Sequence, residues 1–151
     1  MLDLKAFQKA KFEPRETEVT LDALAEAGFG DGKVIVRGLT AHELAEAEES
    51  ASKGKLLSDL VERLAGAGNE KIGALMDGIG FHQDVPASLA KRLEHVRLAT
   101  MEPKLDLSDV AKLAESFPVE FSIMANKIME LTGKGQQAQV KRKPSGKTPA
   151  S

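Results

Sequence analysis

The chain has 151 residues, of which 42% are apolar and 29% are charged, and its formal net charge at pH 7 is −2. This length and composition suit one globular domain with its own core, and the charge calls for no polyanionic partner. The chain has no cysteine, which excludes disulfides and thiolate chemistry.

The charge is distributed unevenly. Residues 134–151 contain five lysines and arginines and no acidic residue, whereas the remaining 133 residues contain 16 basic and 23 acidic residues, a net charge of −7. We interpret the chain as an acidic folded body with a short basic tail. The first residues lack the apolar run of a signal peptide, and no stretch approaches the roughly 18 apolar residues of a membrane span, so we expect a cytoplasmic protein.

Residues 1–12 place leucine and phenylalanine among lysines, which predicts an N-terminal arm, either a short amphipathic helix or an extended segment. Two interpretations are open: Phe7 and Phe12 pack on the body, or the arm orders when it meets a partner. Pro14 ends the pattern, because proline disfavours a helical conformation in the residue before it. We expect a single domain over residues 13–133.

A small sheet is predicted near the N-terminus. Residues 17–21 alternate between polar and apolar, and residues 33–37 contain three consecutive β-branched residues. A helical turn at 22–27 and a glycine-rich loop at 28–32 separate these two strands. The two strands can pair in antiparallel fashion, but a sheet this small needs a helix against one face to be stable.

The second strand is predicted to turn sharply into a helix. Gly38 permits a tight change of direction. Thr40 and Glu43 have the spacing of a capping box, in which each side chain accepts a hydrogen bond from the other residue's backbone amide. Leu39 and Leu44 stand at the positions of a hydrophobic staple around that cap.

Apolar residues at helical spacing predict a mostly α (α+β) fold with about five helices in all, a two-stranded β element near the N-terminus and no internal repeat. The helical patterns cover 41–64 with a weak point at Gly54, 72–79 after a break at 65–69, 84–102, 106–116 and 118–132. Their expected buried faces include Leu44, Ala47 and Ala51; Leu57, Leu60, Val61 and Leu64; Ile72, Leu75, Met76 and Ile79; Leu89, Leu93 and Val96; and Phe121, Met124, Ile128 and Leu131.

The ends of the last two helices carry clear signals. Asp106 is a good N-cap with Asp109 three residues on, and Pro118 belongs in the first turn of the final helix. Gly133 is predicted to be the C′ residue of that helix. From Lys134 to Ser151 the chain is rich in Gln, Lys, Pro, Ser and Gly, so we expect a disordered basic tail.

No pattern of catalytic chemistry emerges. His42, His82 and His95 form no short-spaced metal motif, no serine lies in GxSxG, and the glycine-rich loops at 28–32 and 66–68 match no phosphate-binding motif. We therefore expect no enzyme, no metal and no cofactor. The basic tail offers weak, salt-sensitive contact with phosphates, but the acidic body would repel the same polyanion, so we expect no nucleic-acid partner.

Several short segments, in order over residues 12–136, resemble a family of tail assembly chaperones from long-tailed (siphovirus-like) phages and prophages. The order and spacing of these segments carry the resemblance, because each one alone is a weak motif. The matching segments are 12–15 with Val19, 34–44, 70–72, 85–86, 91–92, 101–107, 117–121, 126–128 and 131–136.

The resemblance implies a mostly helical, non-enzymatic late protein of the host cytoplasm that is absent from the mature virion. Such proteins bind the tape measure protein and keep it soluble until tail tube subunits polymerise around it; a helix-in-groove mode fits a long helical partner. The family also often makes a longer product by ribosomal frameshifting, whose extra part recruits the tail tube protein. Gly133-Lys134 and Gly146-Lys147 are dipeptides that a slippery sequence can encode.

No binding residue can be transferred from the family. Exposed-aromatic reasoning makes Phe7, Phe12, Phe117 and Phe121 the candidate partner-binding residues, with core packing as the alternative for Phe117 and Phe121. The alternative function is a small DNA-associated regulatory protein that uses its basic tail; retention on heparin after deletion of residues 134–151 would favour it. A third reading, a minor structural tail protein, would be detected in purified virions.

Overall fold

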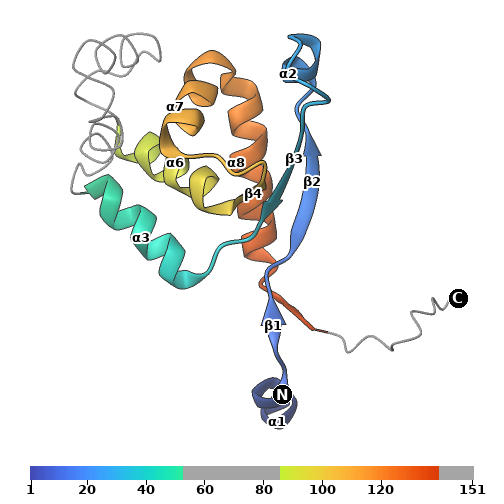
Figure 1. The fold of residues 1–151 in the computed structure, drawn as a ribbon. Helices are drawn as coiled ribbons and strands as arrows, with labels where there is room; N and C mark the ends of the chain where they lie inside the picture. The colour runs from blue at the N-terminus through green and yellow to red at the C-terminus, as the bar shows by residue number, and fades with distance from the viewer. Residues whose placement is uncertain (53–85, 140–151) are drawn as a thin grey trace, which may run out of the picture.

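The structure, a computed structural model, describes residues 1–52 and 86–139. The expectations for Gly54, for residues 57–64, 65–69 and 72–79, for His82, and for the tail beyond residue 139 lie outside the described residues. In chain order the described elements are α1 (Leu4–Lys9), β1 (Phe12–Glu13), β2 (Glu16–Thr20), α2 (Asp22–Glu26), β3 (Lys33–Arg37), α3 (Ala41–Ser52), α6 (Ala87–Ala99), β4 (Thr100–Glu102), α7 (Leu107–Ser116), α8 (Pro118–Gly133) and β5 (Gln137–Ala138) (Figure 1).

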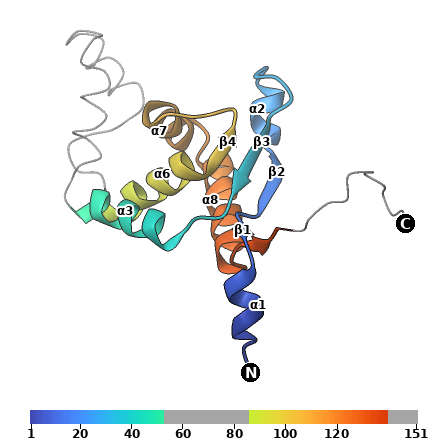
Figure 2. The ribbon, with the colours of Figure 1, turned by 60° about the horizontal axis from the view of Figure 1, so that its bottom comes forward.

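The mostly helical fold and the small N-terminal sheet are as predicted. β2 and β3 pair in antiparallel fashion, with Val19 opposite Val34. The helices of the body lie on one side of this sheet in both ribbon views (Figures 1 and 2). The side chains of Val19, Val34 and Val36 are buried in the same core as those helices. The helix layer therefore supplies the support that two short strands need.

The sheet has a third strand that the sequence did not predict. β4 follows α6 directly and pairs with β3, placing Thr100 opposite Val36 and Glu102 opposite Ile35, with an irregular register between Ile35 and Val36. The prediction that the helix runs to about Glu102 was wrong by three residues. Thr100 ends the helix instead, because its hydroxyl donates to the carbonyl of Val96 at 2.7 Å while its backbone is extended.

The N-terminal arm and the start of the tail pair with each other. β1 and β5 form a separate two-stranded ribbon, with Phe12 opposite Ala138. Disorder from residue 134 onward was therefore a wrong expectation for Gln137 and Ala138. The expected C′ role of Gly133 was also wrong: α8 includes Gly133, and Gly135, with φ of 71°, takes the left-handed conformation.

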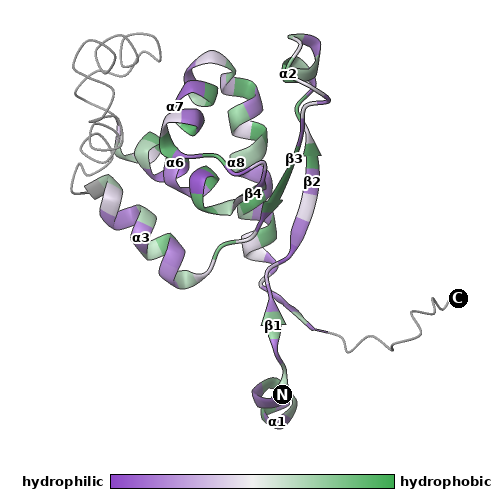
Figure 3. Ribbon diagram, in the orientation of Figure 1, coloured by the Kyte–Doolittle hydropathy of each residue, from purple (hydrophilic) through white to green (hydrophobic). Residues whose placement is uncertain are grey.

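Helices α6, α7 and α8 build most of the core. The buried faces expected for α6 and α8 are confirmed: Leu93 and Val96 of α6 are fully buried, with Leu89 packed against them, and the four predicted apolar residues of α8 are all buried. On α3, Ala47 is buried and Leu44 and Ala51 pack on the core. The ribbon coloured by hydropathy shows apolar and polar residues mixed along each helix, as one-sided burial requires (Figure 3).

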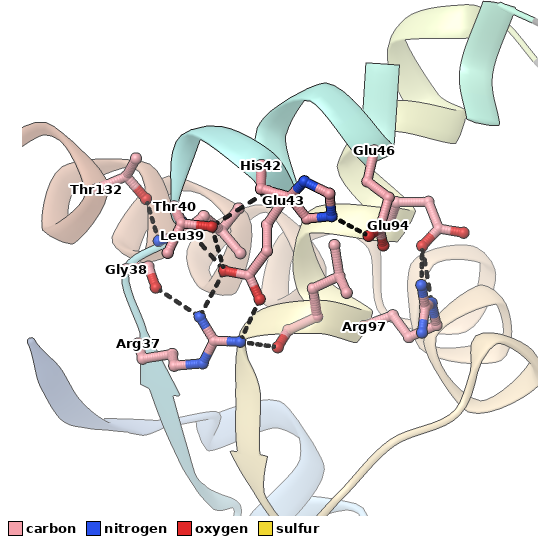
Figure 4. A network of polar contacts seen from close by, with 11 residues as sticks. Arg37, Gly38, Leu39, Thr40, His42, Glu43, Glu46, Glu94, Arg97 and Thr132 are labelled. Carbon is pink, nitrogen blue, oxygen red and sulfur yellow. Dashed lines mark hydrogen bonds and ion pairs between the residues drawn. The ribbon is translucent and has the colours of Figure 1, made fainter. Parts of the chain in front are cut away.

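A polar network joins the end of β3 to the helix layer (Figure 4). Arg37 donates to both carboxylate oxygens of Glu43, from Nη1 at 2.8 Å and from Nη2 at 2.6 Å, and to the carbonyl oxygen of Leu98 in α6 at 3.0 Å. The Glu43 carboxylate also accepts from the Thr40 amide, and the Glu43 amide donates to the Thr40 hydroxyl, so the predicted capping box is present. One guanidinium therefore fixes β3, α3 and α6 together.

Gly38 is needed for a different reason from the one expected. Its φ is not positive, so no unusual turn conformation requires a glycine there. A Cβ at this position would instead lie 3.1 Å from backbone atoms of Leu131 and Thr132 in α8. The Leu39 amide next to it donates to the Thr132 hydroxyl at 2.9 Å. Glycine allows this close approach of the β3–α3 turn to α8.

Replacing Gly38 by alanine should lower the free energy of unfolding by about 1–3 kcal/mol, because the new methyl group would press on helix backbone. The measurement is urea or thermal unfolding. The matched control is Gly133→Ala: its added Cβ meets nothing within 4 Å, so it should keep or raise stability by about 0.5–1 kcal/mol. A Gly38→Ala variant as stable as the parent protein would contradict the close-approach argument.

Glu43 should make stability depend on acidic pH. The hydrogen bonds from Arg37 lower the pKa of Glu43 from 4.5 to about 2. The pair therefore stabilises the fold fully above about pH 4.5, and this contribution is lost as the pH falls toward 2. Glu43→Gln should cost about 1–3 kcal/mol at pH 7, and the difference from the parent should shrink across that window in urea unfolding. A difference that is constant with pH would contradict the assignment.

Candidate functional site

An open apolar groove of about 570 Å³ lies between the end of the sheet nearest α2 and the α7–α8 pair. Its size falls within the range of ordinary ligand and peptide sites. Apolar side chains form most of its surface, and charged side chains stand among them. The apolar members are Leu21, Leu24, Phe29, Val34, Pro103, Leu105, Leu113, Phe117 and Met124, and the charged members are Asp31, Lys33, Asp109 and Lys112.

One wall of the groove is the glycine-rich loop between α2 and β3. Gly28, Gly30 and Gly32 all have positive φ, which only glycine adopts without strain. Between them Phe29 is 65% exposed, and its ring meets that of Phe117 edge to face, with centroids 6.5 Å apart. The loop therefore presents an aromatic side chain to solvent at the mouth of an apolar groove. An exposed aromatic side chain beside other apolar surface is typical of an interaction site.

The opposite wall is held in place by the cap of α7. Asp106 accepts from the Asp109 amide at 2.9 Å, and Asp109 in turn accepts from the Asp106 amide at 3.1 Å, so this predicted capping box is also present. The Asp109 backbone hydrogen bond, with help from Ser108, lowers the pKa of Asp106. The capping box fixes the N-terminal end of α7, the helix that contributes Leu113 to the groove.

A weaker contact joins α2 to α8. The Glu120 side chain is buried near the start of α8 and accepts from the Ala23 amide in α2 at 3.4 Å. The backbone amide of Leu21 donates to the carbonyl of Gly32 at 2.7 Å and closes the loop on itself. These contacts place α2 and its loop over α7 and α8 without covering the groove.

The four sequence-predicted aromatic residues fall in three different places. Phe7 and Phe12 lie in the arm, with ring centroids 5.5 Å apart, and are 53% and 41% exposed. Phe117 is partly buried and lines the groove. Phe121 is buried in the core, with the Arg92 guanidinium 5.9 Å from its ring centroid. The structure therefore brings Phe7 to Phe12, leaves Phe117 apart from them, and removes Phe121 from the surface.

The histidines among the described residues do not form a site. His42 is exposed and lies 3.3 Å from Glu46 on the same helix. His95 is buried in α6, and among the described residues its Nε2 has no hydrogen-bond partner. Burial, and then the charges of Lys91 and Arg92, lower the pKa of His95, so its imidazole is neutral at pH 7. Within residues 1–52 and 86–139 no three metal-binding side chains cluster, and none of the helices there is long and apolar enough to cross a membrane.

A scan against protein-family models and searches of curated proteins and of solved structures found no significant match to this chain.

The groove was missed by the sequence analysis, although its parts were noted. The loop at 28–32 was recognised as a connection, and Phe117 as a candidate contact. What the sequence does not show is that Phe29 in the loop after α2 meets Phe117 at the α7–α8 junction, 88 residues later along the chain. The available signal was Phe29, because a large aromatic residue between glycines is seldom a core residue.

His95 should make the protein less stable below about pH 6.5. As the pH falls, the imidazole gains a proton in the unfolded chain but stays neutral in the folded one, so the unfolded state is favoured. In His95→Leu this loss of stability between pH 7 and 5 should be smaller, measured by urea unfolding at each pH. The control His42→Gln changes an exposed imidazole and should keep the parent's slope; an unchanged slope in His95→Leu would refute the assignment.

Proposed function

We propose that this chain is a tail assembly chaperone of a long-tailed phage or prophage, and that its groove binds a helix of the tape measure protein. The proposal combines the ordered sequence resemblance over residues 12–136 with one structural observation. That observation is the open groove, because an apolar concave surface with charged side chains beside it is what an amphipathic partner helix requires.

The chemistry of the groove agrees with a helical partner. Apolar residues recurring on one face of a partner helix would enter between Phe29 on one wall and Leu113 on the other. Lys33, Lys112, Asp31 and Asp109 stand beside the apolar surface, where they can meet polar residues that flank the apolar face of such a helix. A long apolar-rich helical protein, kept from aggregating by many such contacts, is the class of partner that fits.

The proposal includes the rest of the role that the resemblance implies. The chaperone acts in the host cytoplasm and is not retained in the mature virion. Tail tube subunits polymerise around the tape measure protein that it presents. Contact with the tail tube protein is assigned to a longer frameshift product, and synonymous recoding at Gly133-Lys134 and Gly146-Lys147 that left a larger product intact would remove this part of the proposal.

The test is co-expression of the full chain with the tape measure protein encoded in the same gene neighbourhood. We expect the tape measure protein to be soluble only with the chaperone, and the two to co-purify. Phe29→Lys should weaken co-purification about tenfold or more, because it replaces an exposed aromatic contact by a charge. Met129→Ser is the control, since Met129 is also an exposed apolar residue, on α8, but does not line the groove.

Two results would contradict the proposal. One is a tape measure protein that stays insoluble and does not co-purify with the parent chain. The other is binding that Phe29→Lys and Met129→Ser leave equally strong, which would move the contact away from the groove even if the chaperone role holds.

A further inference from the structure

Helix α7 forms one wall of the groove along most of its length. Its groove-lining residues recur every three or four positions, as one face of a helix does. They are Asp109, Lys112, Leu113 and Ser116, with Phe117 directly after the helix. From Asp109 to Phe117 this face extends over about 12 Å, or about two turns. A helix bound in the groove can therefore lie beside α7, with its side chains passing those of α7 in sequence.

The groove face of α7 changes from apolar to charged across its width. Ala114 is buried in the core, Leu113 is partly buried and Lys112 is exposed. Lysine side chains commonly lay their methylene groups along apolar surface and keep the ammonium group in water. The Lys112 ammonium therefore belongs at the outer edge of the groove, beside the apolar surface that Leu113 and Phe117 provide.

The other three charged residues that line the groove have contacts within the protein. Asp31 accepts from the Lys33 amide at 3.0 Å, and the Lys33 ammonium lies 3.8 Å from the Glu18 carboxylate. Asp109 accepts from the Asp106 amide at 3.1 Å and so completes the cap of α7. These contacts hold the two groove carboxylates against the backbone and place an acidic side chain next to Lys33.

Lys112 differs from these three residues. In the part of the chain that the structure describes, its side chain makes no hydrogen bond and no ion pair. The four charges that line the groove sum to zero, so we expect no long-range attraction of a charged partner. The groove therefore offers one uncommitted cation beside an apolar surface, and its effect on a bound helix is local.

We propose that Lys112 selects the helix that binds in the groove. The selected helix carries a glutamate or aspartate at the edge of its apolar face, where the carboxylate meets the Lys112 ammonium. A helix with lysine or arginine at that position would bring two like charges together, which weakens its binding. The identity of this helix rests on the proposed function, under which it is a segment of the tape measure protein.

The exposure of Lys112 sets the size of the effect. Because the ammonium stays at the edge of the groove, water screens the ion pair, and the pair should change affinity severalfold and not by orders of magnitude. The preference should also fade as the salt concentration rises. The apolar contacts of the groove then supply most of the affinity, and Lys112 supplies the discrimination between helices.

The test uses two synthetic peptides that share one apolar face and are long enough to be helical alone. One peptide has glutamate and the other has lysine at the positions that flank this face. Fluorescence anisotropy of each labelled peptide, titrated with the full chain at low salt, gives the two dissociation constants. The parent chain should bind the glutamate peptide about three to ten times more tightly than the lysine peptide.

Two variants and a matched control assign the preference to one residue. Lys112→Glu should reverse it, and Lys112→Met, which keeps a long side chain, should bring the two dissociation constants close together. Lys104→Glu is the control: Lys104 is exposed between Pro103 and Leu105, which line the groove, but does not line it. It makes the same change in net charge and should keep the parent's preference. Both lysines are exposed, so circular dichroism should show the parent's fold for every variant.

Three results would overturn the proposal. The parent chain binds neither peptide or binds both equally well; Lys112→Glu keeps the parent's preference; or Lys104→Glu reverses the preference as Lys112→Glu does, which would assign the effect to net charge.

The tape measure protein separates this proposal from the proposed function. If the tape measure protein does not co-purify with the parent chain while the peptide preference is present, the chaperone role is wrong and the role of Lys112 stands. If it co-purifies equally well with the parent and with Lys112→Glu, and the peptides show no preference, the chaperone role stands and that of Lys112 is wrong.

Discussion

The ion pair between Arg37 and Glu43 is the contact on which the arrangement of the body depends. The guanidinium binds the carboxylate with two nitrogen–oxygen contacts and donates to the carbonyl of Leu98, so the sheet, α3 and α6 are held at one point. The same carboxylate caps α3, and therefore cannot be exchanged for an apolar group without losing the helix start. The Arg37 guanidinium is planar and contacts both carboxylate oxygens at once, which the ammonium group of a lysine would not reproduce.

Next to this pair, the β3–α3 turn touches α8 directly. Gly38 brings the turn within contact of the α8 backbone, and the Thr132 hydroxyl accepts from the Leu39 amide while donating to the carbonyl of Ile128 at 2.7 Å. Each buried polar group here has its partner, so this end of the sheet is fixed in position. At the other end the long Glu120–Ala23 hydrogen bond and the Phe29–Phe117 pair connect α2 and its loop to α8 and the residue before it, and the groove opens there.

The sequence predicted features that depend on neighbouring residues and missed those that depend on distant ones. Both capping boxes, the antiparallel pairing of β2 with β3, and the buried faces of α6 and α8 follow from local spacing, and the structure confirms them. β4 was missed because three residues are too few to show the alternation of a strand. β5 was missed because polar composition predicts disorder, while its partner strand lies 125 residues earlier along the chain.

The role of Gly38 shows the same limit at a single residue. Glycine after a strand predicts a turn, which is present, but the physical need for glycine comes from α8, a helix that begins 80 residues later. The candidate site also depends on contacts between residues that are far apart in the sequence. For Phe7 and Phe12 the sequence left packing on the body and exposure in an arm both open. The burial of Phe121 and the groove position of Phe117 depend on how α7 and α8 pack.

An open apolar groove is a liability in a free protein, because it invites non-specific association until the intended partner arrives. Under the proposed function, the tape measure protein is that partner. A long helical protein that fills several grooves along its length gains the advantage of multivalent binding.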